Sequence, residues 1–165
     1  MAHLTLKTIV PYLLATMLIV SCSSSQKISV AARDDIKGNW TLDRITYDGL
    51  ATSDKVKITL LDEGDEACLI NSTWALPNNG NGSYTLVGNS PGCTPGQRNI
   101  VWSYQKTGGQ PYFQYKILPG GVKAKQITDG YRLKITSFSK GNFTAQTEVA
   151  FEGKSIFINY SFSKR

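Results

Sequence analysis

Apolar and polar residues alternate along most of the chain beyond residue 40, and the period of the alternation is two rather than 3.6. The clearest runs are residues 143–151 and 155–163, where every second side chain is predominantly apolar. This period is typical of β-strands that bury one face. The pattern predicts about nine strands, at residues 40–47, 55–61, 68–76, 83–87, 98–105, 112–118, 131–137, 143–151 and 155–163.

Stretches rich in Gly, Asn and Pro separate these runs, among them PNNGNG, KTGGQ and KGN, and they favour tight turns. Short strands joined by tight turns form an antiparallel meander, which avoids exposed edges by closing on itself. We therefore expect an all-β fold, an up-and-down antiparallel β-barrel of about eight to nine strands with a short N-terminal helical turn near residues 30–37. A transmembrane barrel is disfavoured, because the outer positions are mostly Lys, Thr, Gln and Glu.

The N-terminal stretch combines Lys7, an apolar run over residues 9–20 and Cys22. A run of about a dozen apolar residues is too short to span a bilayer and is typical of a secretion signal. The segment Ile19-Val20-Ser21-Cys22 resembles the lipobox of bacterial lipoproteins. The resemblance implies cleavage before Cys22 and lipidation of that cysteine, with acyl chains such as palmitate holding the protein on a membrane. The alternative is a chance cysteine behind an ordinary secretion signal.

The chain then divides into a signal peptide (1–21), a linker (22–34) and one barrel domain (35–165). We expect the protein to lie in the cell envelope of a Gram-negative bacterium, lipid-anchored at the periplasmic face of the outer membrane. Loss of Lys7 with the signal peptide lowers the formal net charge from +6 to about +5. The remaining Lys and Arg residues are scattered, which disfavours a nucleic-acid partner.

The single histidine, His3, lies in the signal peptide, so the mature chain contains none. This excludes histidine-based catalytic triads and histidine-ligated zinc. No two carboxylates are grouped as a hydrolytic pair and no G-x-S-x-G elbow is present, so we expect no enzyme, no cofactor and no metal site. The acidic stretch DEGDE lacks the residue order of an EF-hand loop, and we expect it to be a solvated turn.

Cys68 and Cys93 are the two cysteines that remain in the mature chain outside the lipobox. In an oxidising compartment an even pair is most simply a disulfide, which is our prediction. Two free thiols or a redox pair are the alternative, and the absence of Cys-x-x-Cys spacing argues against a redox pair.

The triplet Gly38-Asn39-Trp40 follows the short helical segment and resembles the G-x-W signature that opens lipocalins. With tracts such as NIVWSYQKTGGQPYFQYKI, the mature chain is similar to bacterial lipocalin-like lipoproteins. The resemblance implies a calycin-type barrel in which Gly38 and Trp40 form a structural plug at the closed end. It also implies that a cation of the last strand, Lys164 or Arg165, packs across the Trp40 ring.

Nine aromatic residues are candidates for the inner face of the barrel and for ligand binding: Trp74, Tyr84, Trp102, Tyr104, Phe113, Tyr115, Tyr131, Phe143 and Tyr160. Rings with a few hydroxyls suit a small hydrophobic or amphipathic molecule, and binding or carrying such a ligand is our leading hypothesis for function. The alternative is that the rings fill the barrel. The protein is then a non-catalytic scaffold whose loops 88–97 and 118–130 bind a protein partner in the envelope.

Overall fold

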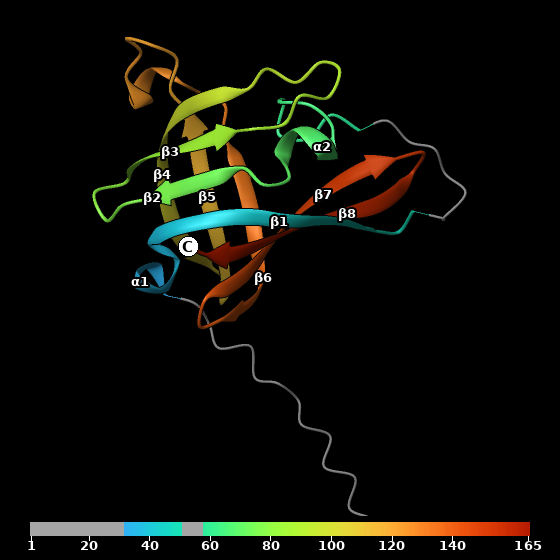
Figure 1. The fold of residues 1–165 in the computed structure, drawn as a ribbon. Coiled ribbons are helices and arrows are strands. Elements are labelled where there is room, and N and C mark those ends of the chain that lie inside the picture. The colour runs from blue at the N-terminus through green and yellow to red at the C-terminus, as the bar shows by residue number, and fades with distance from the viewer. Residues whose placement is uncertain (1–31, 51–57) are drawn as a thin grey trace, which may run out of the picture.

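Eight strands pair antiparallel in the order in which they occur along the chain (Figure 1). The computed structural model describes residues 32–50 and 58–165. The strands are β1 (Gly38–Asp48), β2 (Thr73–Leu76), β3 (Asn81–Leu86), β4 (Gly96–Thr107), β5 (Gln110–Ile117), β6 (Tyr131–Ser139), β7 (Asn142–Phe151) and β8 (Lys154–Lys164). Because β8 pairs with β1, the sheet closes into a barrel, which confirms the predicted fold class.

Two bulges interrupt the ladders, one in β1 between Leu42 and Arg44 and one in β6 between Ile135 and Ser137. A bulge adds one residue to its strand and so moves the inward face by one position. In β1 this brings Ile45 rather than Arg44 into the core, where Ile45 is 4% exposed. The bulge thus explains why the apolar spacing changes from two to three after Leu42.

The connection from β1 to β2 departs from the predicted strands. The strand expected at 55–61 is wrong for residues 58–61, where the backbone forms only a single bridge from Leu60 to Gly64. Residues 55–57 of that prediction lie outside the described part. The strand expected at 68–76 is reduced to β2, because its first residues belong to helix α2 (Glu66–Leu69). The Asp65 side chain accepts a hydrogen bond from the Cys68 amide and caps this helix, which favours helix over strand there.

The two ends of the barrel are built differently (Figure 1). Helix α1 (Arg33–Ile36), which coincides with the predicted helical turn, precedes β1 at one end, and we call this the closed end. Four connections lie at the other, open end: residues 58–72 of the β1–β2 connection, residues 87–95, residues 118–130 with a 3₁₀ turn at Ala124–Gln126, and the β7–β8 turn at residues 152–153. The inward side chains of all eight strands form one core between these ends.

Candidate functional site

Six large rings pack together in the half of the interior nearer the closed end. We call them the indole–phenyl group, and they are Trp40, Trp74, Trp102, Phe113, Phe143 and Phe162. Trp74 meets the edges of Phe113 and Phe162 at centroid distances of 6.2 and 5.7 Å, and Phe143 stacks on Phe162 at 4.5 Å. All six are buried, from fully buried to 3% exposed. Four of the predicted ligand-binding residues (Trp74, Trp102, Phe113 and Phe143) therefore lie in tight ring-to-ring packing, as an eight-stranded barrel permits.

Trp40 is the member of this group that lies at the closed end, next to helix α1. Its ring is fully buried, meets the edge of Phe143 at 4.7 Å, and donates a hydrogen bond from Nε1 to the Ile36 carbonyl of α1 at 2.6 Å. Of the two cations considered for its ring, Lys164 makes the contact, with Nζ 5.5 Å from the ring centroid. Arg165 instead bonds through its backbone amide to the Asn39 carbonyl.

Four tyrosines line the half of the interior nearer the open end: Tyr84, Tyr115, Tyr131 and Tyr160. We call them the phenol group. Tyr115 is stacked on Tyr131 at a centroid distance of 4.8 Å and meets Tyr84 edge to face at 6.1 Å. Tyr84, Tyr115 and Tyr160 are buried and Tyr131 is half-buried. The remaining predicted residue, Tyr104, is half-buried on β4 towards the closed end and belongs to neither group.

The hydroxyls of the phenol group differ in their partners. Tyr131 donates to the Asp62 carboxylate at 2.7 Å, Tyr84 donates to the Glu63 carboxylate, and Tyr160 is hydrogen-bonded to the Thr147 side chain. The Tyr115 hydroxyl is fully buried and has no hydrogen-bond partner within residues 32–50 and 58–165. Burying a hydroxyl without a partner costs about 1–3 kcal/mol, so this atom is the one inner polar group whose needs the described protein does not meet.

Burial keeps these phenols protonated. It raises the pKa of Tyr115 well above its ordinary value, with a further contribution from the neighbouring Tyr84, Tyr131 and Tyr160 hydroxyls. Burial, followed by the hydrogen bond to Glu63, raises the pKa of Tyr84, and the pKa of Tyr131 rises in the same way beside Asp62. At neutral pH these phenols are therefore neutral, and the Tyr115 hydroxyl is left as an O–H donor in an apolar setting, which suits hydrogen bonding to a ligand rather than proton transfer.

Residues 60–72 cover part of the open end, and we call them the cap segment. Leu60, Leu61, Cys68 and Leu69 are buried against the core. Leu61 and Asp62 both have left-handed backbone angles, φ 51° and 56°, in a tight turn closed by the Leu60–Gly64 bridge. A left-handed backbone conformation costs energy for a leucine, and burial of the Leu61 side chain compensates for that cost. The turn points Asp62 and Glu63 at the phenol group.

Two further links hold the cap segment in place. Cys68 is bonded to Cys93 of the β3–β4 loop, with Cα atoms 5.4 Å apart, which confirms the predicted disulfide. The Glu63 carboxylate accepts hydrogen bonds from Arg98 Nε at 3.1 Å and Nη2 at 3.0 Å. The Glu63 side chain is only 9% exposed, so the prediction that the DEGDE stretch is a solvated turn is wrong for this residue. Its partners Arg98 and Tyr84 lie on neighbouring strands, β4 and β3, and shield it from water.

Glu63, Asp62 and Arg98 are the functional candidates that sequence reasoning missed. The signal for them was slight: an acidic pair directly after the apolar pair Leu60 and Leu61, where a solvated turn would have no apolar neighbours. Among the described residues, no group of three or more His, Cys, Asp or Glu side chains is placed to hold a metal ion.

Comparisons of the chain with protein-family models, with curated proteins and with solved structures find no match. The closed eight-stranded antiparallel barrel is consistent with a calycin-like fold. Within residues 32–50 and 58–165, no helix combines the length and the apolar character needed to cross a bilayer.

Proposed function

We propose that the protein is a non-catalytic, lipid-anchored binding protein of a Gram-negative cell envelope, which takes a small, mostly apolar molecule through the open end of its barrel. The barrel fold is compatible with such a role. The observation that carries the proposal is the buried, unpartnered hydroxyl of Tyr115. A ligand oxygen or nitrogen that accepts from this hydroxyl removes the penalty of leaving it unpaired.

The surroundings of Tyr115 narrow the class of ligand. The rings of Tyr84 and Tyr131 pack against it on one side. Trp74 and Phe113 of the indole–phenyl group pack against it at centroid distances of 5.4 and 5.5 Å. A flat apolar body with one hydrogen-bond acceptor matches this arrangement, because the rings supply contact area and the phenol fixes orientation. A charged ligand is disfavoured by the low polarity of these walls.

The route for the ligand passes the cap segment. The closed end is blocked by Trp40, which is hydrogen-bonded to α1. The open end is covered in part by the cap segment, whose Asp62 and Glu63 side chains accept hydrogen bonds from Tyr131 and Arg98. Displacing Tyr131, the half-buried member of the phenol group, exposes Tyr115 without disturbing the indole–phenyl group.

Native mass spectrometry of the protein purified from its own envelope tests the proposal. We expect the wild-type protein to carry a compound of defined mass, Tyr115→Phe to lose most of it, and Tyr112→Phe to keep it. Tyr112 is the matched control because it lies on the same strand and faces outward. Wild-type protein that carries no compound contradicts the proposal.

The lipid anchor is supported by the sequence around Cys22, which lies outside the described residues. We expect the mature chain to begin at Cys22 and to incorporate labelled palmitate, and we expect Cys22→Ser to abolish the labelling. Globomycin, which blocks the lipoprotein signal peptidase, should leave the precursor uncleaved. Normal processing in its presence contradicts the anchor.

A protein partner at the loops is the second candidate function. In the described part of the chain, the large hydrophobic residues that are exposed are Val87 and Val122, at 56% and 38%. Val87 adjoins the loop 88–97 and Val122 lies in the loop 118–130, the two loops proposed as a partner surface. Crosslinking in cells through residues placed at 87 and 122 should then capture one envelope protein, and the absence of a crosslink at both positions contradicts this candidate.

A further inference from the structure

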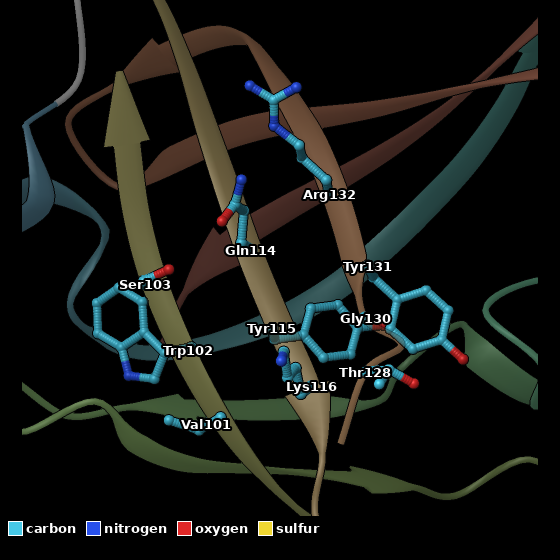
Figure 2. A pocket seen from close by; sticks show the side chains of 10 residues that line it. All are labelled: Val101, Trp102, Ser103, Gln114, Tyr115, Lys116, Thr128, Gly130, Tyr131 and Arg132. Atoms are coloured by element: carbon cyan, nitrogen blue, oxygen red, sulfur yellow. The ribbon is translucent and has the colours of Figure 1, made fainter. Parts of the chain in front are cut away.

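A hollow of about 310 Å³ lies on the outer wall of the barrel, over three neighbouring strands (Figure 2). Its outward lining residues alternate in sequence with buried inward ones, as Ser103 follows Trp102 and Gln114 precedes Tyr115. The hollow opens on the outer face of the sheet, and its lining also includes Trp102 and two members of the phenol group, Tyr115 and Tyr131. We call it the outer groove.

The strand register explains why the wall is hollow here. Ser103, Gln114 and Arg132 lie directly across from one another on β4, β5 and β6. Val101 and Lys116 form the next row, and Gly130 closes it, with the position of its absent Cβ only 3.0 Å from Lys116 Cγ. Residues facing outward in adjacent rows normally cover the sheet between them. The short Ser103 side chain leaves space open here, whereas at Gly130 the Lys116 side chain packs directly against the backbone.

Two cations border the outer groove, and none of its ten lining residues is Asp or Glu. Arg132 is held in place because its guanidinium lies 3.6 Å from the Tyr112 ring centroid and Nη2 donates to Thr107 Oγ1 at 3.2 Å. Lys116 donates from Nζ to the Ile127 carbonyl at 2.6 Å. A guanidinium has five N–H donors and an ammonium has three, so both keep donors for another acceptor. Asp129 precedes Gly130 in the chain but does not line the groove.

The neutral residues of the groove supply both aromatic surface, from Trp102, Tyr115 and Tyr131, and hydrogen-bonding groups. Gln114 offers both a donor and an acceptor, and Ser103 and Thr128 offer hydroxyls, while Val101 gives a small apolar surface. The volume is at the lower end of the range for small-molecule sites, about 300–1,000 Å³. The groove thus combines a positive rim with a floor that matches a compact, hydroxyl-rich molecule.

We propose that the outer groove binds an acidic sugar, a hydroxylated ring that carries a carboxylate. Arg132, at one end of the groove, binds the carboxylate by charge-assisted hydrogen bonds. Lys116, at the other end, and Gln114, Ser103 and Thr128 bind the ring hydroxyls. The sugar comes either as a free monosaccharide or as a residue of an acidic polysaccharide. This site is additional to the interior ligand site, with which it shares Tyr115 and Tyr131 as lining residues.

Calorimetric titration of the full chain in detergent tests this site with galacturonate, galactose, a short oligogalacturonate and inorganic phosphate. We expect galacturonate or its oligomer to bind, and galactose, which differs in lacking the carboxylate, to bind about tenfold more weakly or worse. Binding of the oligomer alone identifies a polysaccharide as the source, and equal binding of the monomer identifies the free sugar. Higher salt should weaken binding, because the rim is exposed.

Three variants locate the site. Arg132→Gln should lower the affinity by about tenfold or more, and Lys116→Gln by a smaller factor, because its ammonium already serves Ile127. Ser103→Leu fills the floor and should abolish binding while leaving both cations in place. Lys154→Gln is the control for loss of one charge, since Lys154 is exposed on the distant β7–β8 hairpin, and it should bind as the wild type does.

Several results would overturn the proposal. They are equal binding of galactose, binding of phosphate without binding of either uronate, no binding of any uronate by folded protein, and a Lys154→Gln effect as large as that of Arg132→Gln. Tyr115 is among the lining residues, but its hydroxyl is fully buried and does not reach the outer surface. Tyr115→Phe should therefore leave galacturonate binding unchanged while it removes the interior ligand, which distinguishes a failure of this site from a failure of the interior site.

Discussion

The two halves of the barrel interior contain the same kind of side chain but treat its polar atoms differently. In the indole–phenyl group, Trp40, Trp74 and Trp102 each donate their indole N–H to a nearby acceptor, at 2.6, 3.0 and 3.0 Å. In the phenol group, Tyr84 and Tyr131 depend on carboxylates of the cap segment, and Tyr115 has no partner in the described part of the chain. Aromatic content alone therefore does not mark a ligand site. Whether the polar atoms of the rings have hydrogen-bond partners distinguishes the packed half from the half suited to binding.

This difference assigns separate tasks to the halves. Rings that touch one another on all sides contribute packing energy, and replacing one leaves a cavity. Phenols whose hydroxyls bond to the cap segment, or have no partner, contribute less to stability and more to recognition. We therefore expect substitutions in the indole–phenyl group to affect folding and substitutions in the phenol group to affect binding.

The largest effect should come from Phe113→Ala in the indole–phenyl group. Phe113 is 1% exposed, and truncating a buried phenylalanine lowers the free energy of unfolding by about 3–5 kcal/mol. Urea denaturation measures the change. Tyr112→Ala, the adjacent residue on the outer face of β5, is the matched control and should cost less than about 1 kcal/mol. Equal losses at the two positions would contradict the assignment of stability to the inner packing.

Much of the barrel could be predicted from the sequence because alternation of apolar and polar residues with a period of two indicates a β-strand with one buried face. The alternation along residues 131–137, 143–151 and 155–163 placed β6, β7 and β8 within a few residues, and the Gly-rich stretches marked their turns. The pairing of Cys68 with Cys93 followed from their even number and expected compartment.

The cap segment could not be predicted in this way. Leu60, Leu61, Cys68 and Leu69 are apolar and close together, so they resemble the ends of two strands, but they are buried by a turn and a short helix. The burial of Glu63 depends on Arg98, 35 residues away in sequence, which no local pattern reveals. Likewise, Tyr84, Tyr115 and Tyr131 have the same inward parity, and only three-dimensional structure shows which hydroxyl lacks a partner.

The next largest effect concerns the covalent link between the cap segment and the β3–β4 loop. Cys68→Ala/Cys93→Ala should lower the free energy of unfolding by about 3.5 kcal/mol, because the bond closes a loop of 25 residues in the unfolded chain. The loss should also increase local opening at the open end. Hydrogen exchange should then speed up more at residues 60–72 than in β7 and β8, where it speeds up only through the lower global stability. Uniform acceleration through the whole barrel would contradict a separation of the two halves.

Alkaline pH should destabilise the open half before the other half. We expect this loss of stability to be smaller than the loss caused by removing the disulfide. Burial, followed by the nearby Glu66 carboxylate, raises the pKa of Tyr47 from 10.0 to about 12, and the pKa values of Tyr84, Tyr115 and Tyr131 are also raised. The unfolded chain then loses these protons at lower pH than the folded chain does. The free energy of unfolding is unaffected by these groups below pH 10 and falls as the pH rises through 12.

Urea midpoints on either side of pH 10 measure this dependence for the wild type and for Tyr131→Phe. The difference between the two proteins removes the contribution of lysine deprotonation, which both share. We expect Tyr131→Phe to lose less stability than the wild type as the pH rises, because it lacks one of the groups with a raised pKa. Parallel losses in the two proteins would show that the Tyr131 hydroxyl is not shielded.

The smallest effect, and the one most specific to the comparison, is that of Tyr115→Phe on stability. In protein freed of any co-purified compound, removing a buried hydroxyl that has no partner should raise the free energy of unfolding by roughly 1 kcal/mol or leave it unchanged. Tyr84→Phe should lower the free energy of unfolding. The Glu63 carboxylate then loses the hydrogen bond that it accepts from the Tyr84 hydroxyl, in a site that is largely closed to water. The opposite signs follow from a single difference, whether the phenol has a partner inside the protein. Equal destabilisation by both substitutions would show that the Tyr115 hydroxyl is satisfied in the empty barrel and would leave the open half no different from the packed one.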